Sequence, residues 1–276
     1  MEGKTVIVTG ATSGIGEIAA IRLAEKGARI VFTARDQSRA DHTMAKLRRA
    51  NPRADHVLHM ADLSTLAEMK RAGAELAREP RIDVLVNNAG ALFNKRQETA
   101  DGLEMTFALN HMAYFVVTNL LLPHLRPGAR IVTVASNAHR GARMDFDDLQ
   151  SRRGYAGFGV YSKSKLANIL FNRELARRAP PGVIANALHP GFVATRFGDN
   201  SGGIMRTVLR VAKPLRAISP EEGAKTIIHL ASSPVVEGVT GEYFYECAVT
   251  TPTQEARNDA DARRLWEISE QIAGLN

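Results

Sequence analysis

The chain has 276 residues, of which 45% are hydrophobic and 24% are charged. This length allows a full hydrophobic core, and the apolar fraction excludes a disordered or collagen-like chain. A single cysteine, Cys247, excludes an internal disulfide and a thiolate metal cluster, and it fits a reducing compartment. The formal net charge is +7, but the basic residues fall in short scattered groups without interleaved aromatic side chains. Such a charge indicates a solvated surface rather than a nucleic-acid site.

No run of apolar residues approaches the roughly 18 that a membrane span requires. The first residues lead directly into an apolar run at Thr5–Thr9, so we expect neither a signal peptide nor an integral membrane segment. The expected location of the protein is the cytoplasm.

Short β-branched runs alternate with amphipathic stretches along the whole chain. Seven strands are predicted, at Thr5–Thr9, Arg29–Thr33, Ala54–Met60, Val84–Val86, Arg130–Ala135, Val183–Leu188 and Glu242–Tyr245. The helical stretches between them include Glu17–Lys26, Leu63–Arg78, Leu103–Leu122, Lys163–Ala179 and Glu221–Ala231. Several strands are apolar throughout, which is typical of a sheet covered by helices on both faces. The alternation predicts parallel pairing through right-handed crossovers, and hence one doubly wound α/β domain over residues 1–276.

Two segments interrupt this alternation. Residues 137–160 are polar, contain glycines and are longer than a usual connection. Residues 192–219 begin with a glycine-bearing stretch and continue into a segment with an apolar face. The second segment predicts either a lid over a substrate or a helix that covers the core, and the sequence leaves both readings open.

A glycine-rich turn follows the first strand. The sequence TGATSGIG covers residues 9–16 and has glycines at positions 10, 14 and 16. Gly10 permits a sharp turn, Gly14 lets the backbone approach a pyrophosphate, and Gly16 lets the next helix pack on the sheet. The free N–H groups at the start of that helix then point at a phosphate. Three glycines alone are a weak motif, but their position between a first strand and a first helix predicts a dinucleotide site.

The end of the second strand bears on the choice of nucleotide. A carboxylate at this point binds the ribose 2′-OH of NAD, whereas this chain has Ala34 followed by Arg35. A guanidinium here can grip a 2′-phosphate and stack on adenine, which favours NADP(H). Asp36 leaves an alternative open, because it can pair with Arg35 instead.

Two further strand ends carry candidates for cofactor binding. Asp62 and Leu63 follow the third strand, where a carboxylate can accept the adenine amino group or cap the next helix. Asn88, Ala89 and Gly90 follow the fourth strand. Small residues there let the backbone lie against a cofactor, and an asparagine can tie neighbouring strand ends together.

A tyrosine and a lysine at helical spacing are the main catalytic candidates. Of the five tyrosines only Tyr161 has a lysine four residues on, and Lys165 then lies on the same helix face. The ammonium favours the phenolate, so we expect a lowered pKa for Tyr161 and proton exchange with a carbonyl or alcohol oxygen. Ser136 closes the fifth strand and can donate to the same oxygen. Asn110 lies within a helix, where asparagine is unfavourable, which indicates either exposure or a polar task.

The histidines indicate no metal centre. His189, Pro190 and Gly191 follow the sixth strand, where a rigid turn can approach the nicotinamide. Neither His189 nor His111 nor His139 has a second histidine or a carboxylate at metal-ligand spacing, so structural roles are expected.

In chain order, TGATSGIG, NNAG, Asn110, Ser136, Tyr161-x-x-x-Lys165 and HPG resemble the short-chain dehydrogenase/reductase family over essentially the whole chain. TARD, NHMAYF and YSKSKLAN resemble its retinol dehydrogenase and WW-domain oxidoreductase branch. The resemblance implies a Rossmann domain with a seven-stranded parallel sheet flanked by helices. It also implies a homodimer or homotetramer.

The resemblance further implies a role for each motif residue. Tyr161 would be the acid/base, and Lys165 would also hold the nicotinamide ribose. Ser136 would orient the carbonyl, and Asn110 would position a water that relays protons to Lys165. The implied cofactor-binding residues are Gly10, Ser13, Gly14, Ile15, Gly16, Arg35, Asp62, Leu63, Asn88, Ala89, Gly90, Tyr161, Lys165, Pro190, Gly191, Val193 and Thr195.

Three function classes fit parts of the pattern. The leading prediction is an NADP(H)-dependent oxidoreductase that interconverts a small-molecule carbonyl and an alcohol. The alternative is an NADP-binding sensor or scaffold without turnover, against which the Tyr161 and Lys165 pair argues. A sugar-nucleotide epimerase is disfavoured, because the chain is short for an added substrate domain.

The substrate class rests on aromatic side chains in the two interrupting segments. They include Phe146, Tyr155, Phe158 and Phe192, which would make the pocket apolar if they faced it. Burial in the core explains the same residues. Since the chain lacks the N-terminal membrane segment expected in animal retinol dehydrogenases, a hydrophobic carbonyl other than a retinoid is expected.

Overall fold

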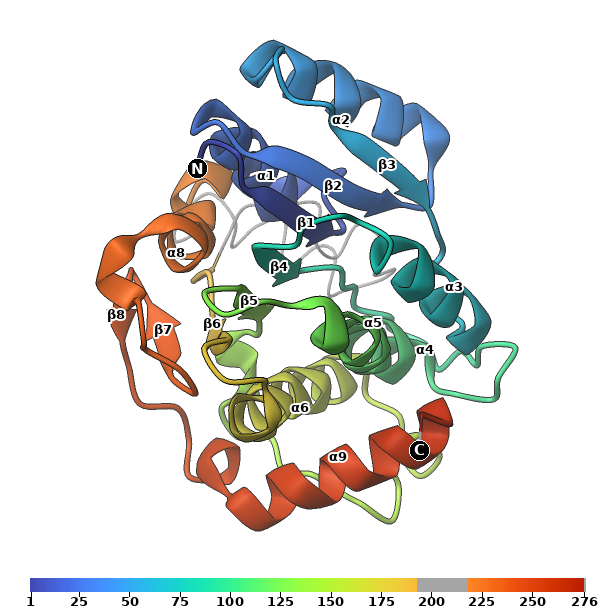
Figure 1. The fold of residues 1–276 in the computed structure, drawn as a ribbon. Coiled ribbons are helices and arrows are strands. Elements are labelled where there is room, and N and C mark those ends of the chain that lie inside the picture. Colours follow the sequence, from blue (N-terminus) through green and yellow to red (C-terminus); the bar gives the residue numbers. More distant parts are fainter. Residues whose placement is uncertain (193–217, 276) are drawn as a thin grey trace.

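A mostly parallel eight-stranded sheet forms the centre of the molecule in the computed structural model, which describes residues 1–192 and 218–275 (Figure 1). The strand order is β3-β2-β1-β4-β5-β6-β7-β8, and the last strand alone pairs antiparallel. The strands are β1 Thr5–Thr9, β2 Arg29–Ala34, β3 Val57–Met60, β4 Val84–Asn87, β5 Arg130–Val134, β6 Ile184–Leu188, β7 Tyr243–Tyr245 and β8 Ala248–Val249. The predicted seven parallel strands are confirmed, and β8 adds a short hairpin strand that the sequence analysis misses.

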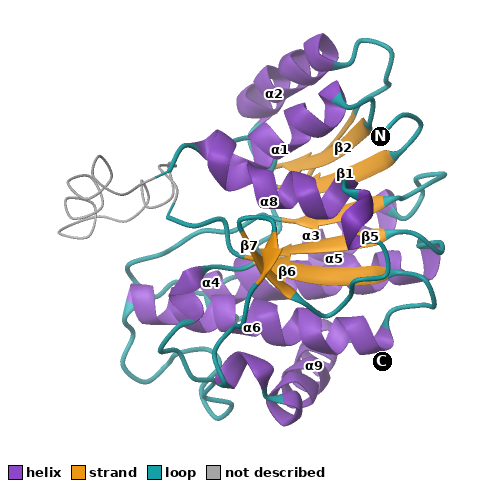
Figure 2. Ribbon diagram, turned by 90° about the vertical axis from the view of Figure 1, so that its left-hand side faces the viewer, coloured by secondary structure: helices purple, strands orange, loops and turns teal. Residues whose placement is uncertain are grey.

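Helices cover both faces of the sheet (Figure 2). The helices are α1 Gly14–Glu25, α2 Gln37–Ala50, α3 Leu66–Leu76, α4 Met105–Phe107, α5 Ala113–Leu121, α6 Gly157–Arg178, α8 Pro220–Ser232 and α9 Asp259–Ala273. In β1, Val6 and Val8 pack into the layer of α1, α2 and α8, while Ile7 packs into the layer of α3, α5, α6 and α9. All three side chains are fully buried, which explains why the middle of this strand is apolar.

The terminal helix α9 packs on the outer side of α6 (Figure 1). Its Trp266 ring stacks on Phe171 of α6 with centroids 5.8 Å apart, and it meets the Phe115 ring of α5 edge-on at 4.9 Å. The indole is 3% exposed. The helix therefore closes the core over α5 and α6.

The predicted helix Leu103–Leu122 is continuous but irregular. Between α4 and α5, residues Ala108–Met112 form a π-helical turn. Over Met105–His124 the helical stretch is long and apolar enough to cross a membrane by length and composition. However, 72% of the relevant window is buried inside the molecule, as in the core helix of a globular protein.

Helix α6 begins at Gly157, earlier than the predicted Lys163. A Cβ at Gly157 would lie 2.5 Å from the Phe93 carbonyl oxygen, so this start requires a glycine. Tyr161 therefore lies inside the helix rather than at its opening. The predicted lid at 192–219 lies outside the described residues except at its two ends, where the Ile218 N–H donates to the Phe192 carbonyl at 2.8 Å.

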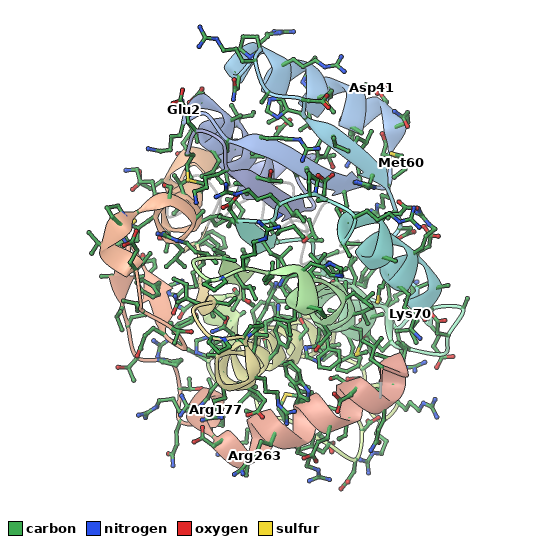
Figure 3. All side chains as sticks on the ribbon, viewed as in Figure 1. Glu2, Asp41, Met60, Lys70, Arg177 and Arg263 are labelled. Carbon is green, nitrogen blue, oxygen red and sulfur yellow. The ribbon has the colours of Figure 1, made fainter. Side chains whose placement is uncertain are left out.

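The scattered basic residues lie on the outside of the molecule. Figure 3 labels Arg263 on α9 and Arg177 on α6 at the periphery. Arg177 pairs with Glu174 at 3.1 Å and with Asp259. These contacts agree with the predicted solvated surface.

Candidate active site

The turn after β1 brings α1 against the loop after β4. Gly10 has φ +68°, and a Cβ there would lie 2.8 Å from the Cα of Ala89. A Cβ at Gly16 would lie 2.2 Å from Nδ2 of Asn88. The Asn88 amide in turn donates to the carbonyl oxygens of Thr9 and Gly10, both at 3.0 Å. The predicted tie between strand ends is confirmed, and Gly16 is required by the Asn88 side chain.

The start of α1 has the features of a phosphate cradle. Ser13 is the N-cap residue, it is exposed, and its hydroxyl makes no capping hydrogen bond. Gly14 has φ +59°, which favours glycine, and the side chain of Ile15 packs against the core. The first N–H groups of a helix have no intrahelical acceptor, and they are left to a ligand together with the Ser13 hydroxyl. These residues fit a dinucleotide phosphate.

The arginine at the end of β2 is available for a ligand. Asp36 does not neutralise it, because one Asp36 carboxylate oxygen caps α2 by accepting from the Arg39 N–H at 2.9 Å. Within the described residues Arg35 forms no ion pair, and its side chain is exposed. A free guanidinium beside the cradle fits a 2′-phosphate.

The Asp62 carboxylate does not cap α3, which is an alternative that the sequence left open. It accepts from the Ser64 N–H at 3.2 Å, whereas α3 begins at Leu66 with Thr65 as its cap. Asp62 is exposed at the sheet edge, where it can meet an adenine amino group. The Leu63 side chain is 4% exposed and belongs to the core, so only its backbone can contact a ligand.

The four catalytic candidates converge beyond the ends of β4 and β5. A Cβ added at Gly90 would lie 3.1 Å from Oδ1 of Asn110 and 3.5 Å from Nζ of Lys165. The Lys165 amine lies 5.7 Å from the centre of the Tyr161 ring. The Ser136 hydroxyl neighbours the Tyr161 phenol and acts to lower its pKa. Residues that lie far apart in the sequence thus come together at one site beyond the ends of β4 and β5.

The π-helical turn explains the placement of Asn110. Its Oδ1 accepts from the Ala91 N–H at 2.8 Å, and its Nδ2 donates to the Ala91 carbonyl at 3.0 Å and to Ser164 Oγ at 2.9 Å. Such turns often occur at functional sites because they redirect side chains and backbone groups. Of the two readings that the sequence left open, exposure is wrong, because Asn110 is fully buried. Ser164, which the sequence analysis does not single out, completes this contact.

Burial controls the protonation of the tyrosine and lysine. It raises the pKa of Tyr161 to about 12, against a smaller opposite effect of the Ser136 hydrogen bond. It lowers the pKa of Lys165 to about 7. The expected lowering of the Tyr161 pKa is therefore wrong for this structure, since desolvation of the phenolate outweighs the opposing effect of Ser136. The phenol holds its proton at neutral pH.

The turn after β6 lies beside an aromatic stack. The Gly191 N–H donates to Nδ1 of His189 at 3.3 Å, and the His189 ring stacks on Tyr245 with centroids 4.2 Å apart. Gly191 has φ +84°, and Pro190 is partly buried. Val193 and Thr195 lie outside the described residues. No group of histidine, cysteine and acidic side chains in the described ranges can hold a metal ion.

Two of the aromatic candidates are used internally. The Tyr155 hydroxyl donates to the Phe93 carbonyl at 2.9 Å, and Phe146 packs against the core with the Arg264 guanidinium 4.5 Å from its ring centre. Phe158 is 52% exposed, and its ring centre lies 6.3 Å from that of Tyr161. Phe192 is 45% exposed. Two apolar rings are thus left near the site.

Comparisons with known proteins agree with this geometry. The family model described as short chain dehydrogenase matches residues 4–203. Retinol dehydrogenase 14 from Homo sapiens is 41% identical over 100% of this chain and 88% of its own. A crystal structure of an uncharacterized protein from Mycobacterium paratuberculosis is 30% identical, has a TM-score of 0.79, and is matched over 99% of this chain and 94% of that one. A short-chain dehydrogenase from Burkholderia cenocepacia in complex with NADP is 26% identical with a TM-score of 0.70, over 88% and 96% of the two chains.

Proposed function

The chain belongs to the short-chain dehydrogenase/reductase family of oxidoreductases that act on alcohol and carbonyl groups, and from this premise we propose that it is an NADP(H)-dependent reductase of hydrophobic aldehydes or ketones. One observation carries the proposal. The Tyr161 phenol, the Ser136 hydroxyl and the Lys165 amine come together at the carboxyl edge of the sheet, next to a cradle suited to a dinucleotide. Dinucleotides bind at this edge in doubly wound sheets.

The residues divide the reaction between them. Reduction of the carbonyl carbon needs a hydride, which a reduced nicotinamide would supply when bound at the cradle. Tyr161, protonated at neutral pH, gives its proton to the carbonyl oxygen. The Ser136 hydroxyl donates to the same oxygen and stabilises the negative charge that develops on it. The reverse reaction returns the proton to the phenolate.

Lys165 and Asn110 restore the proton. The Lys165 amine has a pKa of about 7, so it exchanges protons readily at neutral pH. Its Nζ donates to the Val134 carbonyl at 3.1 Å, which fixes it beneath the Tyr161 ring. A Cβ at Gly90 would lie 3.1 Å from Oδ1 of Asn110 and 3.5 Å from the Lys165 amine. A water at this position can therefore contact both groups, and Asn110 can orient it. Lys165 would also hold the nicotinamide ribose.

An apolar substrate is supported by the two exposed phenyl rings. Phe158 lies one helical turn before Tyr161, and Phe192 follows the nicotinamide turn at Gly191. Large apolar side chains are normally buried, and an apolar ligand would cover them. The relative that is 41% identical is named a retinol dehydrogenase, so retinal belongs in a substrate panel.

Turnover in the Tyr161→Phe variant tests the reaction. We expect the loss of the proton donor to lower kcat for NADPH-dependent aldehyde reduction at least ~100-fold, which is the usual contribution of a general acid. The Kd for NADPH should stay nearly constant. The measurement follows loss of reduced-nicotinamide absorbance with hydrophobic aldehydes, ketones, quinones and retinal.

Tyr155→Phe is the matched control, because it also removes one phenol hydroxyl but leaves Tyr161 in place, and it should keep turnover. Equal activity of Tyr161→Phe and the wild type would refute the role of Tyr161. Tight NADPH binding by the wild type without turnover on the whole panel would favour a sensor instead.

The cofactor preference rests on Arg35. Replacing Arg35 by serine should raise the Kd for NADPH roughly 10- to 100-fold, the effect of losing a charge-assisted pair of about 1.5–3 kcal/mol. The Kd for NADH should hardly change. Arg49→Ser, which removes an equal exposed charge from the last turn of α2, is the control. Equal wild-type affinity for NADH and NADPH would exclude the preference.

A further inference from the structure

His139 lies directly behind the turn that carries Ser136. Ser136 caps the short 3-10 helix Asn137–His139, and its Oγ accepts from the Ala138 N–H at 3.2 Å. The His139 side chain is fully buried. We infer that His139 is a positioning residue for Ser136. It fixes the Ser136 hydroxyl toward Tyr161, and the His139 ring is itself held by Tyr243 and Thr253 from the C-terminal part of the chain. This inference rests on the proposed function.

The contacts of the imidazole define one tautomer. Nδ1 lies 2.7 Å from the Ser136 carbonyl oxygen, which can only accept, so Nδ1 carries the proton. Nε2 then has a free lone pair and accepts from the Thr253 N–H at 3.4 Å. The neutral Nδ1–H form satisfies both partners. In the other tautomer the Nδ1 lone pair would face the Ser136 carbonyl oxygen, and the Nε2–H donor would face the Thr253 N–H donor.

His139 holds the Ser136 carbonyl oxygen with two hydrogen bonds. The Ser136 carbonyl accepts from the His139 ring and also from the His139 backbone N–H at 3.1 Å. Rotation of that peptide would break both bonds and carry the Ser136 hydroxyl away from Tyr161. Small displacements of a group that orients a substrate lower kcat strongly, because the reacting atoms lose their alignment.

The same ring joins the two sides of the reaction centre. It packs edge-on against Tyr243 with centroids 5.3 Å apart at 76°, and the Tyr243 hydroxyl lies 3.4 Å from Nδ1. Tyr243 lies tilted against His189 at 5.6 Å. His189 leads into the turn at Pro190 and Gly191, which is the predicted nicotinamide contact. His139 therefore connects the Ser136 turn to that turn.

Protonation would break this arrangement. A proton on Nε2 would face the Thr253 N–H, so two donors would oppose each other. The titratable and charged groups around the imidazole are Tyr243, His189, Arg140 and Glu255. Burial and Arg140 lower the pKa of His139, while the Ser136 carbonyl and Glu255 oppose this. The neutral form is therefore retained at neutral pH, and activity should fall only on the acid side.

Two variants separate positioning from packing. Asparagine keeps an N–H donor near the place of Nδ1, whereas leucine keeps bulk without a donor. We expect His139→Leu to lower kcat for aldehyde reduction roughly 10- to 100-fold with little change in KM or in the Kd for NADPH. His139→Asn should recover most of kcat, and its pH profile should lack the part of the acid limb that comes from protonation of the His139 ring. His56→Leu is the stability control and should keep kcat, because His56 is buried just before β3, away from the site, where it accepts from the Ile30 N–H of β2.

A second readout does not depend on turnover. The ¹⁵N NMR shifts of the His139 ring in the wild type should identify a protonated Nδ1 and an unprotonated Nε2. The inference is overturned if the shifts show the opposite tautomer, or if both His139 variants lose kcat equally. If the wild type turns over no substrate, the proposed function fails, and the ring shifts still decide whether His139 holds Ser136 as described.

Discussion

At the level of one residue, burial of Lys165 gives its amine a pKa suited to proton transfer and lowers the stability of the folded protein. The amine is buried between the rings of Tyr114 and Tyr161, 5.8 and 5.7 Å from their centres. Burial lowers its pKa to about 7 from an ordinary value of 10.5. The unfolded chain therefore binds this proton more tightly than the folded protein. The contribution of Lys165 to stability is present above pH 10.5 and is lost as the pH falls toward 7.

Lys165→Met should consequently make the protein more stable and inactive. We expect a gain of about 1–3 kcal/mol in the free energy of unfolding at pH 7, less than the full 1.36 kcal/mol per pKa unit because one hydrogen bond is lost. The Val134 carbonyl that bonded the amine keeps Asn168 Nδ2 at 3.4 Å. Urea unfolding at pH 7 and pH 10 measures the gain, which should shrink at the higher pH.

The neighbouring Lys163→Met is the control for this measurement. Lys163 is only partly buried and lies off the face that carries Tyr161, so its loss should change stability little. A Lys165→Met variant less stable than the wild type at pH 7 would show that the amine is not a burden to the fold.

At the level of elements, the glycines of two helices are under different steric constraints. In α1, Gly16 faces the Asn88 side chain, and an added Cβ would lie 2.2 Å from its Nδ2 and 2.7 Å from the Gly10 carbonyl oxygen. In α6, Gly159 is exposed, and an added Cβ would meet the Ala156 Cβ at 3.8 Å. The first glycine is fixed by a close approach of helix and loop, whereas the second has open space.

The same substitution should therefore have opposite effects in the two helices. Gly16→Ala forces α1 from the Asn88 loop and should cost about 2 kcal/mol or more. Gly159→Ala should stabilise the protein by about 0.5–1 kcal/mol, because alanine favours the helix. Each variant serves as the control for the other in thermal or urea unfolding. Stabilisation by Gly16→Ala would contradict the close packing seen here.

For the whole molecule, buried histidines link the fold to acidity. Burial is the largest cause of a lowered pKa for His56, His111, His139, His189 and His229. The values reach about 4 for His189 and about 3 for His111. Because the folded protein binds these protons less tightly, their stabilising contribution is present above about pH 6.5 and is lost as the pH falls. Acid should therefore destabilise the folded protein.

The free energy of unfolding should therefore fall by several kcal/mol between pH 7 and pH 5, at ~1.36 kcal/mol per pH unit for each histidine that stays neutral in the fold. Urea midpoints at several pH values measure this slope. His111→Leu should make the slope shallower by up to one proton. His42→Asn, at an exposed position of α2, should leave it unchanged. An unchanged midpoint from pH 7 to pH 5 would be inconsistent with buried neutral histidines.

The sheet and most of the candidate site residues can be predicted from the amino-acid pattern. Strands buried on both faces contain apolar runs, such as Val6 to Val8 in β1, so their positions can be predicted from the sequence. The spacing of Tyr161 and Lys165 fixes a common helix face, and Asn88, Ser136 and His189 can be assigned to one edge because parallel strands end together. These features depend on neighbours in sequence and on general rules of α/β folds.

Other features depend on contacts between distant segments and are visible only in the folded protein. The pKa of Tyr161 rises because packing removes water, which no spacing reveals. Asn110 reaches Ala91 through a π-helical turn, and the start of α6 depends on the Phe93 carbonyl. The tautomer of His139 is set jointly by Ser136 and by Thr253, which is 114 residues further on. Desolvation and hydrogen-bond partners arise only when such segments meet in space, so the sequence marks these residues without giving their chemistry.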